Sequence, residues 1–88
     1  MATQNVASLR TKDYDVFRTL VRELREGSGL SQEAFSRRLG RPISFMGKIE
    51  NGTRRLDVIE LIEIAAAVDA DIVTLITELK RRLRDTTA

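Results

Sequence analysis

The sequence predicts a small all-α domain built from five helices. Its 88 residues are enough for one domain, and 42% apolar with 32% charged residues is typical of a folded chain. Apolar residues recur three and four positions apart, which is the helical period, and no stretch alternates as a strand would. Glycines and N-cap residues divide these stripes into five segments joined by short turns. No internal repeat interrupts this pattern.

The first helix is expected to begin at Asp13, a good N-cap residue, and to end near Gly29, which suits a left-handed closing position. One apolar stripe runs along it, formed by Phe17, Leu20, Val21 and Leu24. Residues 1–12 are polar and lack any period, so we expect a flexible arm. Arg10 and Lys12 in that arm could touch a phosphate backbone, although a plain disordered end is the simpler interpretation.

Two short helices follow, separated by a tight turn. Ser31 is expected to cap the first of them and Gly40 to end it. Pro42 fits the start of the next helix, where its missing N–H costs nothing. That helix is expected to run over residues 43–51 and to stop at Gly52. Two short helices joined by a glycine-containing turn form the helix-turn-helix pattern, here at residues 31–51.

The fourth helix is expected to start at Asp57, with Glu60 three residues later completing a variant of the capping box. Its inward residues are expected to be Ile59, Ile62 and Ala66, flanked by Val58, Leu61 and Ala65. Asp71 is expected to cap the last helix, which reaches residue 84 and leaves residues 85–88 as a tail. Its stripe is formed by Ile72, Leu75, Ile76, Leu79 and Leu83.

This last stripe extends beyond what a compact domain needs, and two interpretations stay open. The helix could fold back onto its own domain as an ordinary amphipathic helix. Alternatively, it could form the seam of a homodimer. The candidates for that dimer interface are Val73, Ile76, Leu79 and Leu83.

The expected third helix has two unlike sides on a helical wheel. Its inner side carries Met46, Ile49 and Glu50. The opposite side is small and polar, with a single cation, and is formed by Ser44, Gly47, Lys48 and Asn51. Such a face suits the major groove of DNA, which is about 12 Å wide.

Charge is unevenly placed along the chain. Residues 1–56 carry eleven Lys/Arg and six Asp/Glu, a net charge of +5, whereas residues 57–79 carry six Asp/Glu and no Lys/Arg. Residues 80–88 return to a net charge of +3. Solvated helix faces account for most charge runs, but so large a contrast within one small domain favours a basic face toward a polyanion.

Several classes of function are disfavoured by what the sequence lacks. It has no cysteine and no histidine, the residues that most zinc sites and proton shuttles use. It contains no phosphate-binding loop or nucleophile motif. We therefore expect no enzyme, no metal and no cofactor. No apolar run approaches the roughly 18 residues of a membrane span, so we expect a soluble cytoplasmic protein without a membrane partner.

The segments RELREGSGLSQEAFSRRLG and FMGKIENGTRRLDVIELIEIAAAV resemble the phage-repressor/Cro type of helix-turn-helix protein, the Xre family. The resemblance extends over some sixty residues, to about residue 76, with landmarks in the family's order. It implies a compact five-helix lambda-repressor-like domain at residues 13–84 with an extended C-terminal helix. It also implies DNA binding, usually as a homodimer on a two-fold operator.

The resemblance carries over position by position. Gln32 matches a glutamine that bonds a DNA phosphate and braces the recognition helix, and Ser36 stands where the family has a small residue. Base-facing positions are expected at Ile43, Ser44, Gly47 and Lys48. Contacts to the DNA backbone are expected from Gln32, Arg41, Phe45, Asn51, Thr53, Arg54 and Arg55. Arg25 and Glu50 match a pair that forms a buried ion pair, which agrees with the inward position of Glu50 on the wheel.

Three positions depart from the family pattern. Arg41 is long and basic at the turn, where the family has a polar or small residue, and it could add a phosphate contact. Ile43 stands where a polar residue is common, and it could either meet thymine methyl groups or pack against the preceding helix. Gly47 offers no side chain for a hydrogen bond to a base. Sequence preference would then rest on Lys48, which can reach guanine O6 and N7, and on DNA shape.

The favoured function is a sequence-specific regulator of transcription, acting as a repressor and binding double-stranded DNA as a homodimer. The residues after the DNA-binding core are expected to form only the last helix, so we expect no sensor module and no small-molecule ligand. The alternative is a protein-interaction module that keeps the fold and exposes Ile43 and Phe45 to a toxin or to RNA polymerase, as an antitoxin or a polymerase-contacting factor would.

Overall fold

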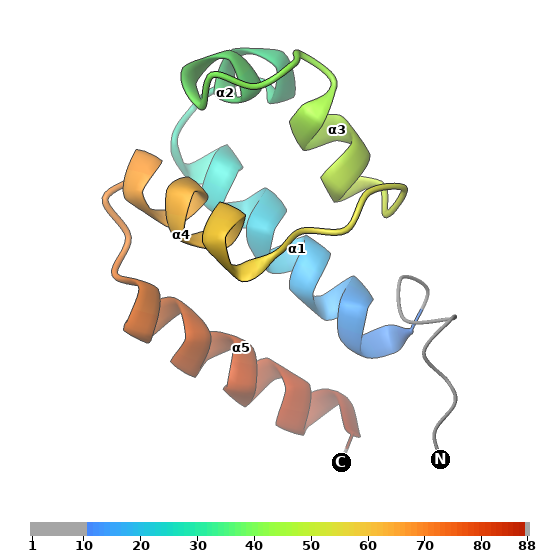
Figure 1. The fold of residues 1–88 in the computed structure, drawn as a ribbon. Coiled ribbons are helices and arrows are strands. Elements are labelled where there is room, and N and C mark those ends of the chain that lie inside the picture. Colours follow the sequence, from blue (N-terminus) through green and yellow to red (C-terminus); the bar gives the residue numbers. More distant parts are fainter. Residues whose placement is uncertain (1–10, 88) are drawn as a thin grey trace.

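The computed structural model describes residues 11–87, and these form five α-helices without any strand (Figure 1). The helices are α1 (Lys12–Gly27), α2 (Gln32–Arg38), α3 (Phe45–Glu50), α4 (Val58–Ala67) and α5 (Ile72–Thr87). The predicted all-α, five-helix domain is confirmed. Within this part of the chain, every helix is too short or too polar to cross a membrane.

Helix α1 is the centre of the arrangement. In Figure 1 it runs through the middle of the molecule, with α2 and α3 on one side and α5 on the other. It packs against both α3 and α5, while α2 packs against α3 and α4 against α5. The core between them is formed by Leu20, Val21, Phe35, Phe45, Met46, Ile49, Leu56, Leu61, Ile64, Ala65 and Leu75.

The start of α1 differs from the expectation. Thr11, in extended conformation, is the N-cap, and its hydroxyl accepts a hydrogen bond from the Tyr14 N–H at 3.1 Å. Asp13 instead lies in the first turn, where its charge complements the helix dipole. The expectation that the flexible arm extends to residue 12 is therefore wrong, because Lys12 is helical. Residues 1–10, including Arg10, lie outside the described residues.

The other expected caps are present. The Ser31 hydroxyl accepts from the Ala34 N–H at 3.1 Å, and Asp57 and Glu60 form a reciprocal capping box at the start of α4. The Asp71 carboxylate accepts from the Thr74 N–H at 2.9 Å at the start of α5. At its far end α5 continues to Thr87, so the expected tail is helical over its described residues.

Helix α4 presents a different side to the core than expected. Ile59 and Ile62 are 63% and 45% exposed, and Ala66 is exposed as well, so the expectation that these three residues point inward is wrong. Val58, expected to flank them, is 61% exposed. Leu61 and Ala65 are buried, and they are joined by Ile64 and Glu60. The helix is apolar on several sides, so its period alone does not select the buried one.

Helix α5 folds back along α1. Leu75 is buried, and Ile72, Ile76 and Leu79 pack partly against the core. An ion pair between Arg82 Nη2 and Glu23 Oε1, 2.7 Å long, ties the two helices together. Packing within the domain thus accounts for the stripe as far as Leu79, and the dimer seam stays a prediction. Of the residues proposed for a dimer seam, Ile76, Leu79 and Leu83 are half-buried, whereas Val73 is 68% exposed.

The turn between α2 and α3 is held by one buried hydroxyl. Helix α3 begins at Phe45, later than expected, and its N-cap Ser44 makes no side-chain cap. The fully buried Ser36 of α2 supplies the cap instead, since its Oγ accepts from the Met46 N–H at 2.9 Å. The same hydroxyl donates to the Gln32 carbonyl at 2.8 Å. A small residue at position 36 therefore both permits and fixes the close approach of α2 and α3.

Ser36→Ala is expected to lower the free energy of unfolding by about 1–3 kcal/mol, because the Met46 N–H would be left buried without a partner. Urea unfolding followed by circular dichroism measures this loss. The matched control is Ser44→Ala, which removes an exposed serine hydroxyl without a cap and is expected to change stability by less than about 0.5 kcal/mol. Equal effects of the two changes would contradict the capping role of Ser36.

Candidate nucleic-acid interface

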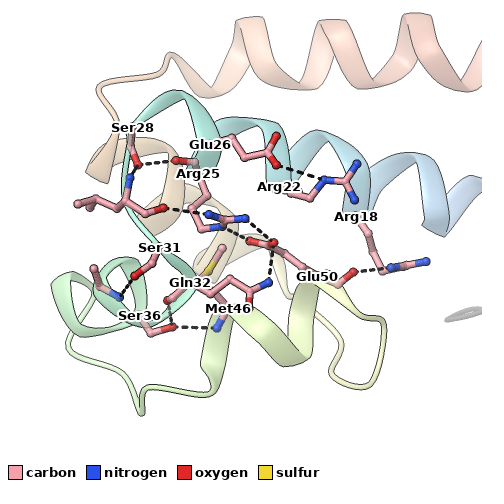
Figure 2. Close-up of polar contacts among 12 residues, drawn as sticks. Arg18, Arg22, Arg25, Glu26, Ser28, Ser31, Gln32, Ser36, Met46 and Glu50 are labelled. Carbon is pink, nitrogen blue, oxygen red and sulfur yellow. Dashed lines mark hydrogen bonds and ion pairs between the residues drawn. The ribbon is translucent and has the colours of Figure 1, made fainter.

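Glu50, the last residue of α3, joins three helices through its carboxylate. Arg25 of α1 donates from Nε to Oε2 at 2.7 Å and from Nη2 to Oε1 at 3.1 Å, a two-pronged contact (Figure 2). Gln32 of α2 donates from Nε2 to Oε1 at 2.9 Å. The side chains of Glu50 and Arg25 are only 4% and 13% exposed. The expected ion pair is thus present and largely shielded from water, and hydrogen bonding to Glu50 raises the pKa of Arg25.

Arg18 of α1 holds the same end of α3 through the main chain. Its Nη1 donates to the Glu50 carbonyl oxygen, and its Nη2 pairs with Asp15. The Arg18 side chain also crosses Gly52, where an added Cβ would lie 3.2 Å from Arg18 Nε. Gly52 has a φ of 85°, so both the backbone and the neighbouring guanidinium favour glycine there. Helix α3 is therefore positioned by two arginines of α1.

Gln32 lies across Gly47. A Cβ at position 47 would be 3.2 Å from Gln32 Oε1, so the glycine leaves room for the amide that bonds Glu50. Gln32 thus braces α3 through its hydrogen bond to Glu50, which is one of the two roles expected for it. A contact between Gln32 and a DNA phosphate stays a prediction, as does the placement of Gly47 against base edges.

The outward side of α3 carries the polar residues that the helical wheel placed there. Ser44, Lys48 and Asn51 are all exposed. Lys48 forms no ion pair within the described residues, so its ammonium group has no competing carboxylate there. Ile43 precedes the helix and is 52% exposed, so it does not belong to the buried core, and its contact with thymine methyl groups stays a prediction.

The loop after α3 is ordered by its own side chains. The Asn51 Oδ1 accepts hydrogen bonds from the Thr53 N–H at 2.9 Å and from the Thr53 hydroxyl at 2.8 Å. This local turn fixes the backbone that leads from α3 to Arg54 and Arg55. Asn51, Thr53 and Arg55 are exposed beside the outward side of α3, as backbone-contacting residues would need to be.

Three residues expected at the DNA backbone make contacts within the protein. Phe45 is only 5% exposed and belongs to the core, so its expected contact with the DNA backbone is wrong for the side chain. The guanidinium carbons of Arg41 and Arg54 lie 5.0 and 4.8 Å from the Phe45 ring centre. Arg41 pairs with Glu60 and Glu63, and Arg54 pairs with Glu60.

Glu60 is the residue of this region that sequence reasoning missed. It was identified only as a capping residue of α4, and its hydrogen bond to the Asp57 N–H confirms that role. Its contacts with Arg41 and Arg54 cross from α4 to the turn before α3 and the loop after it. The signal in the sequence is a pair of carboxylates, Glu60 and Glu63, in a helix whose other residues are apolar.

Comparison with known proteins decides the family. A family model described as a helix-turn-helix domain matches residues 16–79. An Xre-family like protein from Pseudomonas syringae pv. tomato has a solved structure that matches with a TM-score of 0.76 and 32% identity, over 91% of this chain and 98% of that one. The chain belongs to the Xre family of helix-turn-helix proteins.

A second solved structure agrees with this assignment. The restriction-modification controller protein C.AhdI from Aeromonas hydrophila matches with a TM-score of 0.61 and 32% identity, over 72% of this chain and 94% of that one. No curated protein sequence matches. The chain therefore has the DNA-binding fold of Xre-family regulators of transcription, which are non-enzymatic proteins.

Glu50→Ala is expected to lower the free energy of unfolding by about 3–5 kcal/mol, because the shielded Arg25 guanidinium would lose its partner. Chemical unfolding measures the change. The matched control is Glu26→Ala, which breaks the exposed Arg22–Glu26 pair and is expected to cost less than about 1 kcal/mol. A Glu50→Ala protein as stable as the control would show that the Arg25 pair does not hold α1 and α3 together.

Proposed function

We propose that this Xre-family chain is a sequence-specific transcriptional regulator that binds double-stranded DNA with α3 in the major groove. The observation that carries the proposal is the combination of a rigid inner side and a polar outer side on one short helix. Met46, Ile49 and Glu50 fix α3 to the domain, while Ser44 and Lys48 face solvent. A helix presented in this way can reach base edges without losing its support.

Some of the exposed residues contact bases in this proposal, and others contact phosphates. Lys48 is the base-reading cation, with guanine O6 and N7 as its acceptors, and Ile43 meets thymine methyl groups in the same groove. Ser44 accepts or donates at either kind of base pair. Gln32, Asn51, Thr53 and Arg55 contact phosphates on either side and set the register of the helix on the duplex. Gly47 has no side chain to contact a base, and it allows the backbone of α3 to approach the base edges closely.

A homodimer on a two-fold operator completes the proposal. Helix α4 exposes Val58, Ile59 and Ile62 side by side. In a monomer this apolar surface is in contact with water, which is unfavourable. We assign the dimer interface to this surface of α4, with Val73 of α5 as the exposed residue of the neighbouring helix. Two copies of α3 would then read half-sites about one helical turn apart, or a multiple of it. Occupancy of such a site next to a promoter represses transcription.

Binding-site selection from random duplex DNA tests the function directly. The expected result is a palindromic site, bound with an affinity that falls steeply as salt rises, because phosphate contacts release counterions. Absence of duplex binding at low salt would sink the proposal. It would also favour the alternative, in which the exposed Ile43 and the apolar surface of α4 contact another protein such as a toxin or RNA polymerase.

Lys48→Ala is expected to weaken binding to the selected site by about 1–3 kcal/mol and to relax the base preference at one position of each half-site. Fluorescence anisotropy on the selected duplex and on its single-base variants measures both quantities. Arg55→Ala serves as the comparison, since a phosphate contact weakens all duplexes alike and reduces the salt dependence. Equal weakening of selected and random DNA by Lys48→Ala would make Lys48 a phosphate contact only.

Ile59→Asp is expected to convert the dimer to a monomer and to reduce binding to a two-half-site duplex more than to a single half-site. Ile59 is 63% exposed, so the change leaves the domain fold intact. Sedimentation velocity measures the oligomeric state. The matched variant is Val73→Asp, also at an exposed aliphatic residue but on α5. A monomer produced by Val73→Asp alone would move the interface from α4 to α5.

A further inference from the structure

A cleft with a basic wall lies between the turn that precedes α3 and the loop that follows it. Its volume is about 370 Å³. The wall contains three cationic side chains, two hydroxyl groups and the edge of an aromatic ring. The lining residues are Arg41, Pro42, Ser44, Phe45, Lys48, Thr53 and Arg54. Cations and hydroxyl donors around one hollow are the groups that bind a phosphate oxygen.

The two arginines of this cleft are held in place by Glu60. Arg54 donates from Nη1 to Oε1 and from Nη2 to Oε2, both at 2.9 Å, and Arg41 donates from Nη1 to Oε2 at 3.3 Å. The Glu60 side chain is only 10% exposed. Both guanidinium groups also lie over the Phe45 ring, whose position is fixed by the core. Neither arginine is therefore a freely moving surface side chain.

Glu60 stays ionised under ordinary conditions. Hydrogen bonds from Arg54 lower the pKa of its carboxyl group, and the backbone hydrogen bond from Asp57 and the nearby charges of Arg54 and Arg41 act in the same direction, against the effect of burial. Three cations in the cleft face two carboxylates, Glu60 and Glu63, so the local charge stays positive. Each guanidinium has five N–H donors, more than its contacts with these carboxylates use.

We propose that Glu60 is a positioning residue for DNA binding, which holds Arg41 and Arg54 in place for one backbone phosphate at this cleft. That these two arginines contact the DNA backbone is already expected from the family resemblance, and the new element is the role of Glu60. The proposal rests on the DNA-binding function proposed above and names one group of the DNA that the site receives. The advantage of this arrangement is that the arginine side chains are ordered before DNA binds. A surface arginine loses side-chain freedom when it grips a phosphate, whereas these two have lost it on folding. Lys48 also lines the cleft, so a phosphate held there would lie next to the outward side of α3.

The direction in which one substitution changes DNA affinity distinguishes a positioning role of Glu60 from a simple effect of its charge. Removing a carboxylate near DNA should strengthen binding if charge alone matters, because the repulsion of phosphates is reduced. Glu60→Gln is expected to weaken binding instead, by about tenfold, the loss of one well-placed charge-assisted hydrogen bond. Gln also occurs at this position of capping boxes, so the Asp57 contact at the start of α4 is kept. The melting temperature of each variant checks that the fold is retained.

The matched control is Glu63→Gln. Glu63 pairs with Arg41 at 2.7 Å, but its side chain is 45% exposed and it has no contact with Arg54. Its neutralisation is expected to leave DNA affinity equal or to raise it. Unchanged or tighter binding by Glu60→Gln, with wild-type protein binding the same duplex, would overturn the cleft proposal alone. Failure of the wild-type protein to bind any duplex would instead remove the proposed function on which it rests.

A neutral methylphosphonate placed at each phosphate of the duplex in turn locates the contact. One position is expected to weaken wild-type binding about tenfold, as the loss of one charge-assisted contact would. The same position should have little further effect on Glu60→Gln or on Arg54→Gln, because these variants no longer present the guanidinium. A merely destabilised domain would be weakened at every phosphate equally. Additive losses at all positions would therefore show that Glu60 acts only on stability.

Discussion

The buried carboxylate of Glu50 is the interaction on which the placement of α3 depends. A helix of six residues has no stability of its own, because helix nucleation costs more than so few hydrogen bonds return. Its position must come from tertiary contacts. Glu50 supplies them at the C-terminal end through Arg25 and Gln32, and Ser36 supplies the missing cap at the N-terminal end. The chain thus fixes both ends of the helix that carries the side chains proposed to face DNA.

A second buried carboxylate, Glu60, connects α4 to the same region. It starts α4 through the capping box and, with Phe45 beneath, orders Arg41 and Arg54 on either side of α3. The opposite side of α4 is apolar and exposed at Ile59 and Ile62. One ten-residue helix therefore carries both the proposed dimer surface and the support of the proposed phosphate cleft. A displacement of α4 would move the proposed dimer surface and the two arginines together.

Local signals in the sequence were sufficient for the number and order of the helices and for the inner side of α3, although not for the first residues of α1 and α3. Ser31 and the Asp57–Glu60 box act through neighbouring backbone groups, so their roles depend on a few adjacent residues only. The polar side of α3 followed from its period, since Lys48 and Asn51 lie opposite Met46 and Ile49. The resemblance to Xre proteins added the Arg25–Glu50 pair, whose partners are 25 residues apart and share no helix.

The sequence by itself determined the all-α class, the helix-turn-helix segment and the family, because these depend on helical period, caps and landmark spacing. Only the tertiary structure decided which side of α4 is buried, since that helix is apolar on several sides and its period is ambiguous. Packing alone also placed Phe45 in the core and Ile43 at the surface. The tertiary structure was also needed to identify the partner of Arg41 and Arg54. Glu60 reaches both arginines from α4, a separate element, and no local sequence signal specifies that approach.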